Sequence, residues 1–128
     1  MNTMKEIRLH EGELNVMELL WSNEELAARD IAHIVKEYIG WEKNTTYTVI
    51  KRLINKGAVV RTEPGFICRA AITKERVQQI ETNYIIQKFY GGSLSDFISI
   101  YLRNQKLSNI ELMELERIIS EQKNNAGA

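Results

Sequence analysis

The chain has 128 residues, of which 44% are hydrophobic and 27% are charged, and its 17 basic residues balance its 17 acidic residues. This composition is typical of a soluble globular protein with one core, or with one small domain and an extension. No run of about 18 apolar residues is present, so the sequence predicts no membrane insertion. The N-terminus carries no apolar signal segment, and we expect a cytoplasmic protein. Its near-zero net charge argues against a protein that coats nucleic acid through bulk charge, but not against one with a local basic patch.

The sequence predicts neither a catalytic site nor a cofactor. Cys68 is the only cysteine, so an internal disulfide and a thiolate metal cluster are excluded, and we expect a buried or half-buried thiol. His10 and His33 have no carboxylate or thiol at ligand spacing, so no metal is predicted. No phosphate-binding glycine loop, nucleophile elbow or paired-histidine motif is present. We therefore predict that the protein is not an enzyme, and we expect its acidic residues to lie solvated on helix surfaces.

Helical periodicity predicts three short helices in the first half of the chain, over residues 10–21, 28–39 and 44–56. The glycines at positions 40 and 57 end the second and third helices. The predicted buried side of the second helix consists of Ile31, Val35, Tyr38 and Ile39. Trp21 and Trp41 are expected to pack in the core. The tight link between the second and third helices is typical of a helix-turn-helix.

Two short strands are predicted next, over residues 58–63 and 66–72, with Pro64 and Gly65 in the turn between them. Three helices followed by a β-hairpin form the winged helix-turn-helix architecture. We therefore predict a mostly α fold with a small β-hairpin wing, in which residues 1–73 form a winged helix-turn-helix domain.

The remainder of the chain, residues 74–128, is predicted to be a helical dimerisation domain. Helices are expected over residues 73–90, after a cap at Ser93, and after a capping box that begins at Ser108. Three short helices cannot bury their many apolar side chains alone, and a symmetric dimer is the common solution. The predicted dimer contacts are Tyr84, Phe89, Leu94, Phe97, Ile98, Tyr101, Leu112, Leu115 and Ile119.

The third predicted helix lies in a local concentration of positive charge, because residues 43–61 contain five basic residues and no acidic one. Its apolar arc consists of Thr46, Val49, Ile50, Leu53 and Ile54. The opposite arc presents hydroxyls, amides and cations, which suit base edges and phosphates of duplex DNA. The predicted DNA contacts are Lys43, Asn44, Thr45, Tyr47, Thr48, Lys51, Arg52, Asn55, Lys56 and Arg61.

Some of these residues allow a second interpretation. Arg52 is predicted to contact a guanine or a phosphate, and the alternative is a solvated charge. Thr45 also suits a helix cap, and Tyr47 lies at the border of the two arcs, where packing is equally compatible with its position. Arg61 and the hairpin tip suit either contact with an adjacent groove or a simple connection. The lysines are predicted to contact phosphates rather than bases.

The segment NTTYTVIKRLINKGAVV resembles the recognition-helix signature of the BlaI/MecI penicillinase-repressor family, which includes copper-responsive CopY-type repressors. LHEGELNVMELLW is similar to the family's first helix, and KFYGGSLSDFISIYL with LSNIELMELERII is similar to its dimerisation tail. The resemblance covers nearly the whole chain, from about Leu9 to Glu121. It implies a homodimeric transcriptional repressor on a palindromic operator of double-stranded DNA.

The resemblance also implies a route of release, in which a membrane sensor-protease signal leads to a cut in the dimerisation tail. The family's cut lies between Asn and Phe, and the matching bond in this chain is Ile100–Tyr101, so the asparagine is absent. Copper sensing through the family's C-terminal cysteine motifs is excluded, because no cysteine follows Cys68.

Two other functions remain open on the sequence. A winged-helix regulator would respond to a small ligand held in an apolar cleft of the tail. A winged-helix protein-interaction module would dock an acidic protein on the third helix. Threonine and asparagine on that helix favour base edges over carboxylates, so DNA binding is the first hypothesis.

Overall fold

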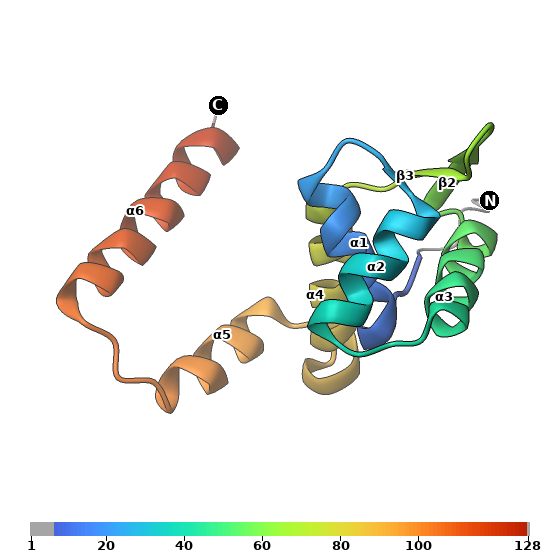
Figure 1. Ribbon diagram of the computed structural model, residues 1–128. Helices are drawn as coiled ribbons and strands as arrows, with labels where there is room; N and C mark the ends of the chain where they lie inside the picture. The colour runs from blue at the N-terminus through green and yellow to red at the C-terminus, as the bar shows by residue number, and fades with distance from the viewer. Residues whose placement is uncertain (1–6, 128) are drawn as a thin grey trace. The chain divides into compact units, whose positions relative to one another are not determined.

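A computed structural model of the protein describes residues 7–127, so the first six residues of the predicted N-terminal domain lie outside it. The chain forms two compact units, which divide between Ile85 and Ile86. The elements, shown in Figure 1, are α1 (Glu11–Ser22), β1 (Leu26–Ala27), α2 (Ala28–Tyr38), α3 (Lys43–Lys56), β2 (Val59–Thr62), β3 (Ile67–Ala70), α4 (Lys74–Tyr90), α5 (Leu94–Arg103) and α6 (Asn109–Ala126).

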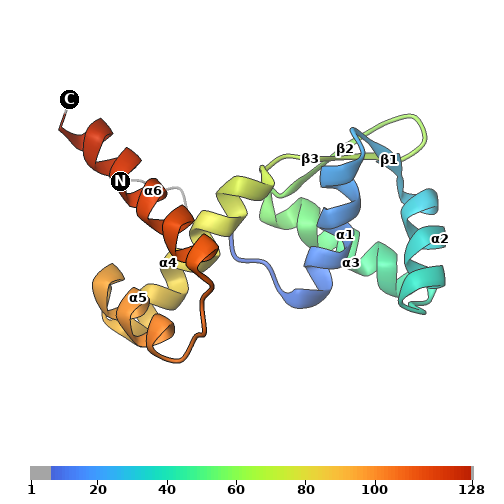
Figure 2. The same cartoon turned by 90° about the vertical axis from the view of Figure 1, so that its left-hand side faces the viewer.

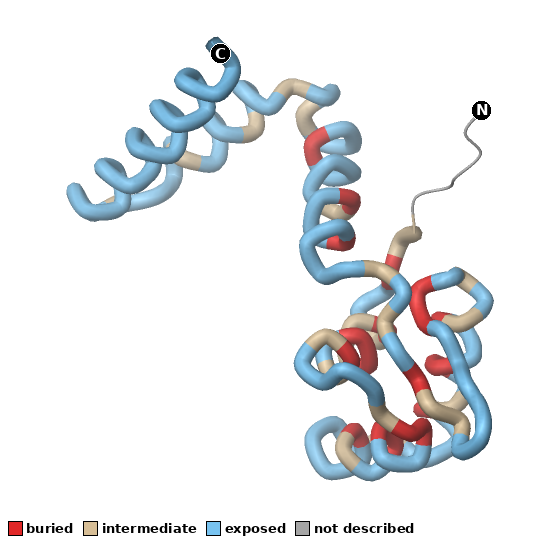
Figure 3. Tube along the Cα trace, turned by 90° about the horizontal axis from the view of Figure 1, so that it is seen from above, coloured by how far each residue is buried: buried red, intermediate tan, exposed pale blue. Residues whose placement is uncertain are grey.

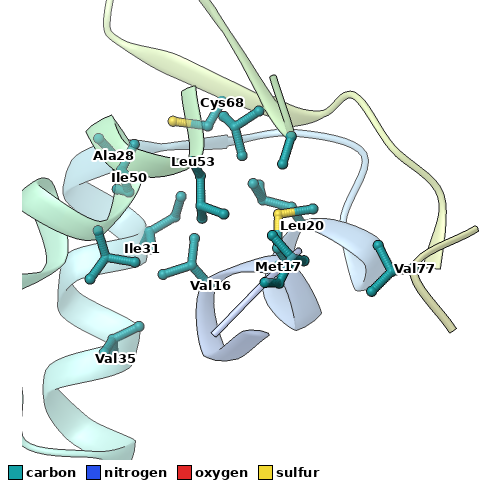
Figure 4. Packing of buried hydrophobic residues seen from close by; sticks show 14 residues of the cluster. Val16, Met17, Leu20, Ala28, Ile31, Val35, Ile50, Leu53, Cys68 and Val77 are labelled. Atoms are coloured by element: carbon teal, nitrogen blue, oxygen red, sulfur yellow. The ribbon is translucent and has the colours of Figure 1, made fainter. Parts of the chain in front are cut away.

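The first unit contains a group of three helices, α1, α2 and α3, with a small sheet at one end of the group (Figures 1 and 2). Apolar side chains that recur every three or four residues meet between the helices, because that spacing places them on one face. Met17, Ile31, Ile50 and Leu53 are fully buried there, as Figure 4 shows. Trp21 and Trp41 pack against this core, as predicted.

The sheet confirms the predicted hairpin and adds a strand that was not predicted. Its strand order is β1-β3-β2, and both pairings are antiparallel. Cys68 on β3 lies opposite Arg61 of β2 and Leu26 of β1. The winged helix-turn-helix architecture is therefore confirmed, with the hairpin strands shorter than the sequence suggested.

The end of α2 differs from its prediction. Tyr38 was expected on the buried side, but this expectation is wrong, because its side chain is 84% exposed. Ile39 is exposed as well, whereas Ile31 and Val35 on the same face are buried. The reason is the extent of the core, which covers α2 as far as Val35 and not its last turn.

The beginning of α4 belongs to the first unit. Thr73 caps the helix by accepting a hydrogen bond from the backbone N–H of Arg76 at 3.0 Å. The indole N–H of Trp21 donates to the carbonyl of Ile72 at 2.9 Å. Val77 and Ile80 are buried. Hydrogen bonding and apolar contact therefore fix this part of α4 to the first unit.

The second unit contains the end of α4 together with α5 and α6. Ser93 caps α5, and Ser108 with Glu111 forms the predicted capping box of α6. Neither α5 nor α6 has a buried residue, which Figure 3 shows by the absence of red along both helices. Their exposed large apolar side chains include Leu94, Ile98, Tyr101, Ile110, Leu112, Met113, Leu115, Ile118 and Ile119. No helix within residues 7–127 combines the length and the apolar character needed to cross a membrane.

Candidate nucleic-acid interface

The third helix has two chemically different faces, as predicted. Its inner face consists of Thr46, Val49, Ile50 and Leu53, all buried. The outer face of α3 is defined here as the exposed residues Asn44, Thr45, Thr48, Lys51, Arg52 and Asn55. The helix ends at Gly57, whose φ of +84° is in the left-handed region that favours glycine. The outer face therefore combines hydroxyls, amides and two cations on a helix that the core holds from behind.

The five basic residues of the segment 43–61 differ in whether they have an ion-pair partner. Lys51 and Arg52 have no ion-pair or hydrogen-bond partner among the described side chains. Lys43 places its ammonium 5.7 Å from the centre of the Tyr47 ring. The other two, Lys56 and Arg61, pair with carboxylates of the same unit. The unpaired charge of this segment is thus concentrated on the outer face of α3.

Lys56 has a partner inside the protein. Its ammonium donates to Oε1 of Glu13 at 2.7 Å and to the backbone carbonyl of Arg8 at 2.8 Å. The expectation that all acids lie solvated on helix surfaces is wrong for Glu13, which is 1% exposed. Burial of the Glu13 carboxyl favours its neutral form, but hydrogen bonds from Lys56 and from the His10 N–H outweigh this effect, and its pKa is lowered.

The segment around Arg8 connects this buried pair to α4. The guanidinium of Arg8 makes a bidentate ion pair with Glu81, at 2.8 and 3.1 Å, and lies 3.5 Å from the centre of the Tyr84 ring. Tyr84, a predicted dimer contact, thus already has a contact within the first unit. Arg8 therefore connects the C-terminal end of α3 to the middle of α4: its carbonyl accepts a hydrogen bond from Lys56, and its guanidinium pairs with Glu81.

The wing is held to α3 by aromatic contacts. The rings of Tyr47 and Phe66 meet edge to face, with centroids 5.7 Å apart. The guanidinium of Arg61 lies 3.6 Å from the centre of the Phe66 ring and also pairs with Glu63. Hydrogen bonds from Arg61 and from the Phe66 N–H lower the pKa of Glu63. Tyr47 therefore packs against the wing, and Arg61 lies at the base of the hairpin turn with its charge paired to Glu63.

A second group of basic side chains lies between α2 and the start of α3, and the sequence prediction missed it. A hollow of about 200 Å³ is lined there by Arg29, Ala32, His33, Lys36 and Lys43. Of these, only Lys43 was predicted to bind DNA. The available signal was the spacing of Arg29, His33 and Lys36, which places three basic side chains along one flank of α2.

The described part of the chain offers little else that could bind or react. Residues 7–127 contain no group of three His, Cys, Asp or Glu side chains that could hold a metal ion. Cys68 is buried, as expected, and burial raises the pKa of its thiol to about 11. Its thiolate is therefore scarce at neutral pH.

A three-helix group with a helix-turn-helix, a hairpin wing and an exposed polar helix face defines a winged helix-turn-helix protein. The family model described as Penicillinase repressor matches residues 9–121 of the chain. The chain therefore belongs to the penicillinase repressor family, as its resemblance implied.

Individual relatives match almost the whole chain. The penicillinase repressor of Bacillus licheniformis is 28% identical over 124 residues, which cover 94% of this chain and 97% of the relative. The methicillin resistance regulatory protein MecI of Mammaliicoccus sciuri is 23% identical over 118 residues, which cover 91% of this chain and 96% of the relative. The solution structure of the DNA-binding domain of the repressor BlaI matches with a TM-score of 0.53 and 24% identity, over 58% of this chain and 93% of that chain. This last match bears on the fold alone.

Proposed function

We propose that this protein is a homodimeric transcriptional repressor that acts in the cytoplasm and binds a palindromic operator through the outer face of α3. The observation that carries the proposal is the outer face of α3, which contains no acidic residue and exposes Lys51 and Arg52 without an ion-pair partner among the described side chains. Membership of the penicillinase repressor family supports it, since the relatives are named as repressors. The absence of an enzyme activity is part of the same proposal.

The outer face of α3 would lie in the major groove of duplex DNA, which admits one α-helix. Arg52 would read a guanine or a phosphate, and Lys51 would contact a phosphate. Thr45, Thr48 and the two asparagines of this face offer donors and acceptors to base edges. Lys56 takes a different role in this proposal: it holds the end of α3, because a contact with DNA would leave the buried Glu13 carboxylate without its cation.

The exposed apolar side chains of α5 and α6 are proposed to form the dimer interface. Each large apolar side chain that becomes buried contributes about 1.5–3 kcal/mol. Both helices leave such side chains in water in the single chain, so a second copy is the partner that would cover them. One dimer on two half-sites gains affinity because binding of the second half-site is intramolecular.

Release of the operator is proposed to follow a cut at Ile100–Tyr101, after a signal from a membrane sensor-protease. The bond lies in α5, and both of its side chains are exposed. A cut there would separate α6 from the rest of the chain. The dimer would then lose part of its interface, and the gain from two half-sites would fall with it.

The test is a mobility-shift titration with duplex DNA from the region upstream of the protein's own gene. We expect Arg52→Ala to remain a dimer in sedimentation and to lose about 1–3 kcal/mol of specific affinity, roughly 5- to 150-fold. Lys74→Ala is the matched control, because Lys74 is an exposed cation on α4 that pairs with Glu18. Equal operator affinity of Arg52→Ala, Lys74→Ala and the wild type would contradict the role of α3.

The dimer has its own test. Leu115→Glu in α6 places a charge among the exposed apolar side chains and should give a monomer in sedimentation. We expect its operator affinity to fall by about 100-fold or more, since the second half-site no longer contributes. Gln105→Glu, in the link between α5 and α6, is the control for added charge. A Leu115→Glu protein that remains a tight dimer would exclude this interface.

A further inference from the structure

The hollow between α2 and the start of α3 is a concentration of positive charge that the proposed function leaves unused. Four of its five lining residues are Arg29, His33, Lys36 and Lys43, and all four side chains are exposed. No carboxylate is among the lining residues. Basic side chains around one hollow repel one another and therefore favour a bound anion.

Internal ion pairs neutralise only a small part of this charge. Arg29 and His33 have no ion-pair or hydrogen-bond partner among residues 7–127. Lys36 pairs with Glu42 at 3.1 Å, and both side chains are more than half exposed, so the pair is open to exchange. The Lys43 ammonium, 5.7 Å from the centre of the Tyr47 ring, is not held by a carboxylate.

The position of the hollow indicates which anion it takes. Lys43 both lines the hollow and begins α3, so the hollow adjoins Asn44, the first residue of the outer face. In a helix-turn-helix the helix before the reading helix crosses the DNA backbone. The flank of α2 that carries Arg29, His33 and Lys36 would then face the sugar-phosphate chain beside the groove that α3 occupies.

We propose that this hollow binds a backbone phosphate of duplex DNA, with Arg29 and Lys43 as its main ligands and His33 and Lys36 beside them. The inference rests on the proposed function and adds to it the contacts that orient the protein on the duplex. Phosphate contacts fix the orientation of a protein on the duplex without carrying sequence information. The hollow would therefore set how α3 enters the groove, while the outer face of α3 discriminates between sequences.

The experiment compares salt dependences. The operator and a random duplex are each titrated with three proteins: the wild type, Arg29→Gln and the double variant Arg29→Gln/Lys43→Gln. The salt concentration is varied from about 50 to about 200 mM, a range over which the loss of phosphate contacts changes the affinity measurably. Each lost phosphate contact should reduce the slope of log affinity against log salt by about 0.9. Both duplexes should lose affinity by the same factor. Lys74→Gln is the control, because it removes one positive charge outside the hollow. Its slope of log affinity against log salt should equal that of the wild type.

The outcomes separate the two proposals. A wild type that binds no duplex refutes the proposed function itself. A wild type that binds the operator while both hollow variants keep its slope refutes this inference alone. A loss of discrimination between operator and random duplex would assign Arg29 to base reading and overturn the phosphate assignment. Inorganic phosphate that shifts the His33 ring signals at millimolar concentration, with unchanged slopes in the variants, would make the hollow a site for the free ion instead. Thermal unfolding of each variant checks that the fold is intact.

Discussion

Replacement of Lys56 by methionine tests whether this lysine stabilises the fold through Glu13, while the outer face of α3 is left for DNA. The substitution keeps the length of the side chain and removes its charge, which leaves Glu13 buried as a carboxylate without a counter-ion. Oε2 of Glu13 already has no hydrogen-bond partner. Removal of one partner from a buried ion pair typically costs about 3–5 kcal/mol. We expect a loss of this size, which shifts the urea midpoint by more than about 1 M.

The effect should depend on pH with a definite sign. In the wild type the folded-state pKa of Glu13 is lowered from its ordinary value of 4.5, so its contribution to stability is present above that value and lost as pH falls through the lower, folded-state pKa. Without Lys56, burial opposes ionisation and only the His10 N–H supports it, so the pKa of Glu13 rises. The stability deficit of Lys56→Met should therefore be largest near neutral pH and shrink in acid.

The assay is urea unfolding followed by circular dichroism at pH 7 and at pH 4–5. One protein concentration is used throughout, because the stability of the proposed dimer would depend on concentration. Lys51→Met is the matched control, because Lys51 is an unpaired, exposed cation of the same helix. Its stability should change by less than about 0.5 kcal/mol. The double variant Glu13→Gln/Lys56→Met should recover much of the loss, since no buried charge remains. The contrary result is a Lys56→Met protein that unfolds at the same urea concentration as the wild type and reduces the slope of log DNA affinity against log salt by about 0.9. That result would make Lys56 a phosphate contact and refute its role as the counter-ion of Glu13.

Three further predictions concern other parts of the chain. Cys68, whose pKa is raised to about 11, should react with a thiol reagent at pH 8 only after unfolding, and rapid reaction of the native protein would contradict its burial. Gly57→Ala should cost about 1–2 kcal/mol in urea unfolding because of the left-handed φ, and an unchanged midpoint would show that the end of α3 adopts another conformation. Ser108→Ala removes the cap of α6 and should lower thermal stability by about 1 kcal/mol, with Ser99→Ala, inside α5, as the comparison that should lose less.

Local signals explain why most of the fold was predictable. The three helices of the first unit have apolar residues at helical spacing, and glycines follow the ends of α2 and α3. The features that were not predicted depend on contacts between elements that are distant in the sequence. The two-residue strand β1 exists through its pairing with β3, and no pattern in Leu26–Ala27 predicts it. Tyr38 continues the periodicity of α2, but periodicity gives the direction of a side chain and not the extent of the neighbouring core.

The candidate site was predictable in part for the same reason. A helical projection predicted Arg52 on the polar arc of α3 and Lys51 at the flank of that arc, and both residues are exposed. The pairing of Lys56 with Glu13 joins residues 43 positions apart, so neither residue alone indicates it. The hollow likewise depends on the packing of α2 against α3, which brings Arg29 next to Lys43.

The separation of the two faces of α3 has an evolutionary consequence. Substitutions at exposed positions away from structural contacts usually change stability by less than about 0.5 kcal/mol. Asn44, Thr48 and Arg52 are such positions. Under the proposed function, a duplicated copy of this gene can therefore exchange them and acquire a new target sequence while it still folds. Lineages that diverge in this way should vary at these positions and retain Glu13 together with Lys56, a pattern that distinguishes selection on recognition from selection on the scaffold.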